Sequence, residues 1–124
     1  MTLPYGAVVL EHFRRPRNQR SLEKPSAWHE AFNPMCGDRV RIEVELHDAM
    51  ILRAAFTANA CAICTASASL LTERVNGMAV AAARAIPEAE MIGALETDVP
   101  AAREACAVLP LSALREALRG GAGA

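Results

Sequence analysis

Residues 39–46 read RVRIEVEL, and this unbroken alternation of polar and apolar side chains decides the fold. Successive side chains of a β-strand point to opposite faces of a sheet, so the alternation predicts a strand with one buried face. The side chains of that buried face are Val40, Ile42, Val44 and Leu46. Such a strand requires partner strands and a cover for its apolar side.

The flanking segments are predicted to supply the partner strands. His47-Asp48 is expected to form a turn, after which residues 50–57 return as a second strand. The side chains predicted for its apolar face are Leu52, Ala54 and Phe56. Residues 28–32 can add a third strand. The sequence therefore predicts a small antiparallel meander with one buried face.

Helical spacing dominates the segments outside these strands. Residues 5–15 carry Val8, Val9 and Phe13 at near-helical intervals, and Pro16 ends this helix. From Ala62 onward, apolar and small side chains form a second helical stripe that Gly77 terminates. The members of that stripe are Ile63, Ala66, Ser67, Leu70 and Leu71.

The C-terminal third is predicted to contain three further helices. One covers about residues 78–86, and the next opens at Pro87, with acidic side chains near its positive end. The last is predicted to begin at Pro110 and to pack through Leu111, Leu114 and Leu118. Strands followed by helices favour an α+β fold. Residues 1–124 are expected to form one domain, with residues 119–124 as a disordered tail.

Composition restricts the possible partners. The chain has 124 residues, 52% of them hydrophobic, and a net charge of −1, which gives no electrostatic case for nucleic acid. No stretch approaches the ~18 apolar residues of a membrane span, and no secretion signal is apparent, so a cytoplasmic protein is expected. A local basic cluster is compatible with a solvated helix end or with a face for an acidic protein partner. Its members are Arg14, Arg15, Arg17 and Arg20.

The four cysteines carry the strongest functional signal. In a small cytosolic domain such residues indicate metal binding or catalysis rather than disulfides, although buried free cysteines are also common. Cys36 and Asp38 lie in the turn that precedes the long strand, and Cys106 lies in or beside the turn that enters the final helix. Cys61 lies between a strand and a helix, where the helix dipole favours the thiolate. Three thiols and one carboxylate could converge on a tetrahedral site.

Thiolate ligands select zinc, copper(I) or iron–sulfur chemistry, and the spacing alone does not distinguish them. The ligands are single and scattered, unlike the paired cysteines of a structural zinc finger. Cys61 and Cys64 also match a redox C-x-x-C motif, but the expected βαβ context is missing. Cys64 can thus be a spare ligand, a resolving thiol or a core residue.

Three motifs resemble the NifU N-terminal/IscU/SufU family of iron–sulfur cluster assembly scaffolds, in the order in which that family carries them. They are Asn33-Pro34-Met35-Cys36-Gly37-Asp38, the run Cys61 to Ser69, and Arg103-Glu104-Ala105-Cys106. The N-terminal residues Tyr5, His12 and Pro16-Arg17-Asn18 are similar to the family's opening. The resemblance covers about residues 5–118 and implies the family's SufE/NifU-like α+β fold, a three-stranded antiparallel sheet packed against helices.

The resemblance implies that Cys36, Asp38, Cys61 and Cys106 bind an iron–sulfur cluster or zinc. A cysteine desulfurase would deliver persulfide sulfur, and iron would complete a transient two-iron, two-sulfur cluster for acceptor apoproteins. A carboxylate holds such a cluster less firmly than a thiolate, so Asp38 would permit release. A labile cluster could also be shared across a homodimer.

Several positions depart from the family's patterns. Ala105 replaces the histidine that precedes the last cysteine in the IscU branch, whereas Arg103 matches an arginine of the SufU branch. The step from Cys61 to Cys106 has no room for the SufU insertion. Residues 99–103 match the IscU chaperone-binding motif poorly, so the sequence does not predict a dedicated Hsp70 chaperone.

Two functions remain open from the sequence. The first is a non-enzymatic scaffold for cluster assembly and transfer. The second is a zinc-dependent sulfurtransferase, in which Cys106 is the candidate persulfide acceptor and the protein stimulates a cysteine desulfurase. A thiol–disulfide oxidoreductase using Cys61 and Cys64 is a third class, but it leaves Cys36 and Asp38 without a role. None of the three histidines is predicted to be a ligand.

Overall fold

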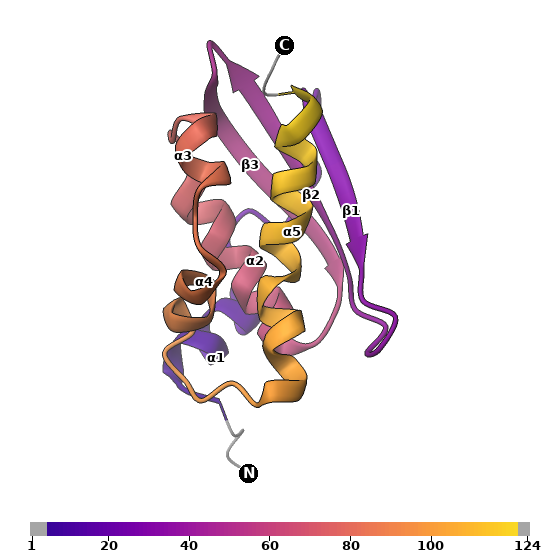
Figure 1. Cartoon of the computed structure of the whole chain (residues 1–124), viewed down its shortest axis with the longest axis vertical. Coiled ribbons are helices and arrows are strands. Elements are labelled where there is room, and N and C mark those ends of the chain that lie inside the picture. The colour runs from indigo at the N-terminus through magenta and orange to yellow at the C-terminus, as the bar shows by residue number, and fades with distance from the viewer. Residues whose placement is uncertain (1–4, 122–124) are drawn as a thin grey trace.

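The computed structural model describes residues 5–121, and Figure 1 shows a three-stranded sheet with helices packed against one face. Strand β1 spans Ala27–Phe32, β2 spans Arg39–His47 and β3 spans Met50–Asn59. The strands are antiparallel and lie in the order β1-β2-β3. The predicted α+β fold and its three-stranded meander are therefore confirmed.

Two long helices cover the sheet, and shorter helices pack around them (Figure 1). In the described part of the chain the helices are α1 (Ala7–Arg14), α2 (Ala62–Val75), α3 (Val80–Arg84), α4 (Glu88–Ala94), the short 3-10 helix η1 (Ala101–Arg103) and α5 (Glu104–Gly121). Helices α2 and α5 contact each other and the strands, α1 packs on α2, and α4 packs on α5. This arrangement places the start of α2 and the start of α5 at the same end of the sheet.

The alternation in β2 builds the core as predicted. Val40, Ile42 and Val44 have no solvent exposure. They belong to one apolar cluster with Leu71 of α2 and Leu111 of α5. Burial of such side chains is the main term that stabilises a domain of this size, so β2 acts as the central support of the fold.

The hairpin turn lies one residue later than predicted. Asp48 and Ala49 occupy it with φ angles of 50° and 61°, and His47 pairs with Met50 as part of the ladder. Positive φ angles at both central residues are typical of the type I′ turn, whose twist suits a two-residue hairpin.

A β-bulge changes one predicted face of β3. The register shifts between Glu45 and Leu46 of β2, and Leu52 is the additional residue on β3. An insertion of one residue exchanges the two faces of a strand beyond it. As a result Ile51 is fully buried and Leu52 is 50% exposed, so the prediction that Leu52 faces the core is wrong. The other two predicted core positions, including Phe56, are buried.

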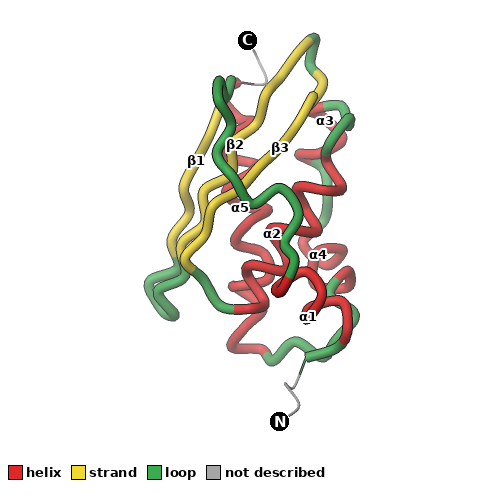
Figure 2. Tube along the Cα trace, turned by 180° about the vertical axis from the view of Figure 1, so that it is seen from behind, coloured by secondary structure: helices red, strands yellow, loops and turns green. Residues whose placement is uncertain are grey.

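The loop between α1 and β1 covers part of the sheet face that the helices leave open (Figure 2). Gln19 forms an isolated bridge with Phe56 of β3, and the Leu22 N–H donates a hydrogen bond of 2.7 Å to Glu43 Oε1. Glu43 is buried beneath this loop. This loop therefore also covers a strand edge, which limits pairing with other chains.

Helix α5 begins at Glu104, and Pro110 lies inside it rather than at its start. A proline lacks the N–H that would bond to the carbonyl four residues earlier, here that of Cys106. Packing against the sheet and α2 keeps the helix continuous in spite of this loss. Cys106 consequently lies in the first helical turn. Residues 119–121, predicted as part of the tail, belong to α5, and residues 122–124 lie outside the described residues.

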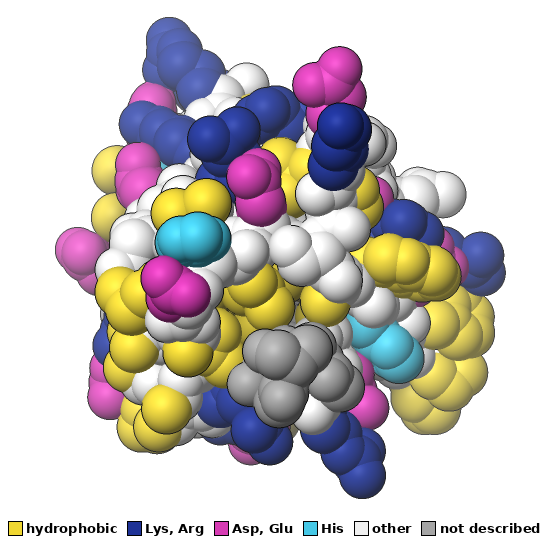
Figure 3. All heavy atoms as spheres, turned by 90° about the horizontal axis from the view of Figure 1, so that it is seen from above, with side chains coloured by type: hydrophobic (Ala, Val, Ile, Leu, Met, Phe, Trp, Pro, Cys, Tyr) yellow, Lys and Arg dark blue, Asp and Glu magenta, His cyan; other side chains and the backbone are white. Residues whose placement is uncertain are grey.

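The outer surface carries charges of both signs. At the end of the molecule seen in Figure 3, basic and acidic side chains are interspersed. In the basic cluster of residues 14–20, Arg15 and Arg17 both form ion pairs with Glu11. Within residues 5–121, the helices are too short or too polar to cross a bilayer.

Ser69 of α2 connects α1 and the following loop to the helical layer. Its Oγ lies 2.7 Å from His12 Nδ1 and accepts the Arg17 backbone N–H at 2.8 Å. Since Ser69 already accepts from Arg17, its own proton is free for an unprotonated ring nitrogen of His12. Burial lowers the pKa of His12, and the nearby Arg17 charge lowers it further, while Glu73 and Glu11 act in the opposite direction.

We expect the free energy of unfolding to decrease as the pH falls below about 6.5, the ordinary pKa of histidine. The unfolded chain binds the proton more readily than the folded one, and the loss continues until the pH reaches the lowered pKa of folded His12. Urea denaturation at about pH 7.5 and about pH 5.5 measures the effect. His12→Gln can retain a hydrogen bond to Ser69 but does not titrate, so its stability should change less. If the free energy of unfolding changed equally with pH in both proteins, His12 would not be the source of the pH dependence.

Candidate metal centre

The turn between β1 and β2 presents the first two site residues. The Asn33 side-chain Oδ1 accepts a hydrogen bond from the Met35 N–H at 3.0 Å. The backbone carbonyl of Asn33 accepts a second one from the Gly37 N–H at 2.8 Å. Gly37 has a φ angle of 78°, which a residue with a side chain adopts only with strain. The turn is thus closed by its asparagine and glycine, with Cys36 exposed and Asp38 buried.

Asp38 points one oxygen at the protein and leaves the other without a protein partner. Its Oδ1 accepts the Cys61 N–H at 3.1 Å, which links the β1–β2 turn to the start of α2. Its Oδ2 is buried and has no hydrogen-bond partner among the described residues. An unpaired buried carboxylate oxygen is costly, and a bound cation would satisfy it.

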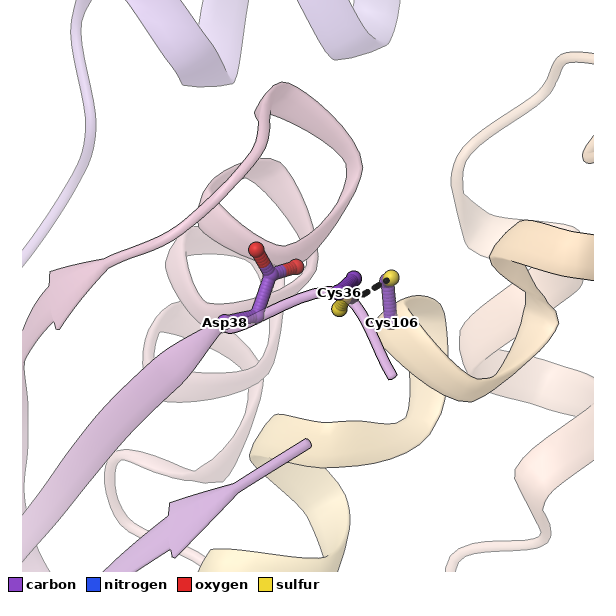
Figure 4. A group of neighbouring side chains, drawn as sticks. All are labelled: Cys36, Asp38 and Cys106. Carbon is purple, nitrogen blue, oxygen red and sulfur yellow. Dashed lines mark hydrogen bonds between the residues drawn. The ribbon is translucent and has the colours of Figure 1, made fainter. Parts of the chain in front are cut away.

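Cys106 completes a compact group. The ligand atoms of Cys36, Asp38 and Cys106 all lie within 4.8 Å of one another. Figure 4 shows the sulfur atoms of Cys36 and Cys106 facing each other across 3.5 Å, with the Asp38 carboxylate beside them. Two soft sulfur atoms and one hard oxygen form a donor set that suits zinc or iron.

Ser67 fixes the part of α5 that carries Cys106. Its hydroxyl donates a hydrogen bond of 2.6 Å to the carbonyl of Ala107, and both groups are buried. The run Cys61 to Ser69 therefore contains two serines with structural roles, since Ser67 is hydrogen-bonded to α5 and Ser69 to α1. Neither hydrogen bond was predictable from the sequence, because the partners of Ser67 and Ser69 lie far away along the chain.

Cys61 lies at the edge of this group. It is the N-cap residue of α2 and is partly buried, and its backbone N–H binds Asp38. Its Sγ is not among the atoms that lie mutually within 4.8 Å. Three of the four predicted ligands are thus brought together, and the fourth is adjacent.

The protonation of Cys61 depends on opposing effects. Burial raises the pKa of its thiol, and Asp38 raises it further, while the backbone N–H groups of Cys64 and Ile63 act in the opposite direction. The helix terminus does favour the thiolate, as predicted, but burial and Asp38 outweigh this effect and the net pKa is raised. A coordinated cation reverses this balance, because a metal-bound thiol is deprotonated.

Burial also raises the pKa of Cys106, to about 12, with further contributions from Cys36, Asp38 and Cys61. Arg103 acts in the opposite direction and lowers the pKa of Cys106. Arg103 also lines a groove together with Cys36.

Cys64 behaves as a core residue in this structure. It lies in the first turn of α2, has no solvent exposure and belongs to the apolar cluster. Burial strongly raises the pKa of its thiol, as do the neighbouring Asp38 and the other cysteines. Of the three roles considered for Cys64, packing fits this environment best.

The fold and the donor set define a class of protein: a small α+β domain that gathers thiols and a carboxylate from three separate elements at one end of its sheet. A family model, the NifU-like N terminal domain, matches residues 4–120. The chain therefore belongs to this family.

Curated relatives carry related names. The chain is 35% identical over 91% of its length to the bifunctional protein NifU/MnmA of Rubrobacter xylanophilus, of which it spans only 23%. It is 36% identical over 59% of its length to the zinc-dependent sulfurtransferase SufU of Bacillus subtilis, spanning 49% of that protein. It is 30% identical to the iron–sulfur cluster assembly scaffold protein IscU of Haemophilus influenzae, with 94% of each chain covered.

A solved structure supports the fold. The N-terminal part of a NifU-like protein from Brucella abortus superposes with a TM-score of 0.76, covering 94% of this chain and 92% of that one, at 22% identity. This likeness agrees with the predicted SufE/NifU-like architecture.

Proposed function

We propose that this domain is a scaffold for the assembly and transfer of iron–sulfur clusters. The observation that carries the proposal is the group of Cys36, Asp38 and Cys106, whose ligand atoms lie within 4.8 Å of one another. The proposed cargo is a transient two-iron, two-sulfur cluster, with Cys61 as the fourth ligand. A cysteine desulfurase would supply the sulfur, and acceptor apoproteins would receive the cluster.

The environment of the group suits a cargo that must leave. Cys36 is exposed, so an acceptor can approach the cluster from that side, whereas Asp38 and Cys106 are buried. A carboxylate is a harder ligand than a thiolate and binds thiophilic iron less firmly. The similarity to a named scaffold over 94% of each chain supports the same function. The proposal places the protein in the cytoplasm, where thiols remain reduced.

Anaerobic reconstitution tests this function. Incubation with ferrous iron, a cysteine desulfurase and L-cysteine is expected to produce sulfur-to-iron charge-transfer bands in the visible spectrum. Subsequent mixing with an apoferredoxin should move these bands to the acceptor. A colourless product with no bound sulfide would contradict the proposal.

A second function is favoured by the position of Arg103, which lines a groove with Cys36 and lowers the pKa of Cys106. In this alternative the bound metal is zinc, and the protein accepts persulfide sulfur at Cys106 and stimulates a cysteine desulfurase. The similarity to a zinc-dependent SufU supports it. Alanine production by the desulfurase discriminates between the two functions. Strong stimulation that depends on bound zinc favours the sulfurtransferase, and none favours the scaffold.

Proton release tests the ligand set under either function. The pKa values of Cys61 and Cys106 are both raised, so these two residues enter the complex as neutral thiols near neutral pH. We expect zinc binding to release one proton from each of them, and therefore about two protons per zinc from this pair. Titration of the reduced protein with zinc in weakly buffered solution, followed by a pH indicator, measures the number. Release of clearly fewer than about two protons per zinc would contradict coordination by both thiolates.

A further inference from the structure

A groove of about 500 Å³ opens beside the metal-binding group and has no assigned occupant. Its lining residues are Asn33, Met35, Cys36, Ala102, Arg103 and Ala105. The groove therefore lies between the β1–β2 turn and the start of α5. Its size is within the range of small-molecule sites.

The walls of the groove indicate the chemistry of a ligand. Arg103 supplies a positive charge, and none of the ion pairs among residues 5–121 includes it. A guanidinium group in this position recognises a carboxylate through charge-assisted hydrogen bonds. Cys36 lines the groove from the β1–β2 turn, opposite the start of α5, and its sulfur lies 3.5 Å from that of Cys106.

The small side chains of Ala102 and Ala105 leave the space between these walls open. Both residues are exposed and contribute only a methyl group to the lining. A larger side chain at residue 105 would extend into the space beside Cys36. The groove thus offers a cation, a sulfur-rich wall and free volume within one short span.

We propose that the groove binds a low-molecular-weight thiol that carries a carboxylate. The carboxylate pairs with Arg103, and the thiol faces Cys36 and the metal-binding group. The inference rests on the proposed function only for the thiol, because a metal bound by Cys36, Asp38 and Cys106 would attract the sulfur of the ligand. The contact with Arg103 requires no metal.

NMR titration of isotopically labelled, reduced protein tests the proposal, in metal-free and zinc-loaded forms. L-cysteine and glutathione represent the low-molecular-weight thiols that carry a carboxylate. The one with the higher affinity is the better candidate for the ligand of the groove. Both are expected to shift the amide signals of Asn33, Met35, Ala102, Arg103 and Ala105. Cysteamine lacks the carboxylate and L-serine lacks the thiol, so each should bind the zinc-loaded protein about tenfold more weakly than L-cysteine.

Two variants test the role of the arginine. Arg103→Gln should weaken the binding of L-cysteine about tenfold while leaving that of cysteamine unchanged. Arg84→Gln, an exposed position on α3, should bind L-cysteine like the wild type. Cysteamine binding as tightly as L-cysteine, or an unchanged affinity in Arg103→Gln, would overturn the proposal.

The outcome is separable from that of the proposed function. A protein that assembles a cluster but shows no shifts in the groove with any thiol contradicts this inference alone. A protein that binds L-cysteine through Arg103 but retains no iron or sulfide supports this inference and contradicts the scaffold function alone.

Discussion

Cys36→Ser and Cys106→Ser are each expected to reduce the amount of cluster bound after reconstitution by about tenfold or more. The two sulfur atoms lie 3.5 Å apart and belong to the same group of ligand atoms, so each variant removes one soft donor from a shared site. A neutral hydroxyl group is a poor replacement for a thiolate on iron. Iron and acid-labile sulfide per chain, measured after removal of excess reagents, give the result.

Cys64→Ala provides the matched control. Cys64 lies close to the same site but packs in the core, so its removal should lower stability by about 1 kcal/mol and leave cluster content unchanged. If folded Cys64→Ala lost as much cluster as Cys36→Ser, the assignment of Cys64 to the core would be wrong. If Cys36→Ser retained a full cluster, the assignment of the exposed thiol as a ligand would fail.

Asp38→Ala is expected to slow cluster transfer to an acceptor apoprotein about tenfold or more. The buried carboxylate adds a negative charge next to thiolate ligands, and it binds iron less firmly than they do. Its removal eliminates both the weak ligand and the like-charge repulsion, so the cluster leaves less readily. Stopped-flow measurement of the acceptor's visible spectrum gives the rate of transfer.

Asp38→Asn separates the effect of the negative charge of Asp38 from that of its hydrogen bond to the Cys61 N–H. Asparagine can still accept the Cys61 N–H that binds Asp38 Oδ1, but it carries no charge. Slow transfer in both variants supports the role of the carboxylate as a labile ligand. Slow transfer in Asp38→Ala alone would assign the effect to the lost hydrogen bond at the start of α2. Wild-type rates in both would contradict the role of Asp38 in release.

The sequence predicted those parts of the fold that depend on local pattern. The alternation in residues 39–46 identified the central strand, because burial of one face imposes a period of two residues. The bulge at Leu52 could not be read from the same pattern, since both Ile51 and Leu52 are apolar and only the pairing with β2 decides which faces the core. Pro110 was interpreted as a helix start because proline favours that position, but tertiary packing extends α5 six residues further toward the N-terminus.

The candidate site was predictable in composition but not in its electrostatics. The Asn33–Asp38 turn and the scattered cysteines indicated a thiol and carboxylate site, and the structure gathers three of the four proposed ligands. The protonation of Cys61 depends on burial and on Asp38, which outweigh the helix terminus and are not visible in sequence. The roles of Ser67 and Ser69 depend on partners in α5 and α1, so a local motif could not reveal them.

We propose that Cys36, Asp38, Cys61 and Cys106 form one site that holds a transferable cluster. The most direct test of this site compares the wild type with the triple variant Cys36→Ser/Cys61→Ser/Cys106→Ser after the same anaerobic reconstitution. The measured quantities are iron and acid-labile sulfide per chain. We predict equal amounts of iron and sulfide in the wild type, and neither in the folded triple variant. A triple variant that reconstitutes like the wild type would contradict the claim.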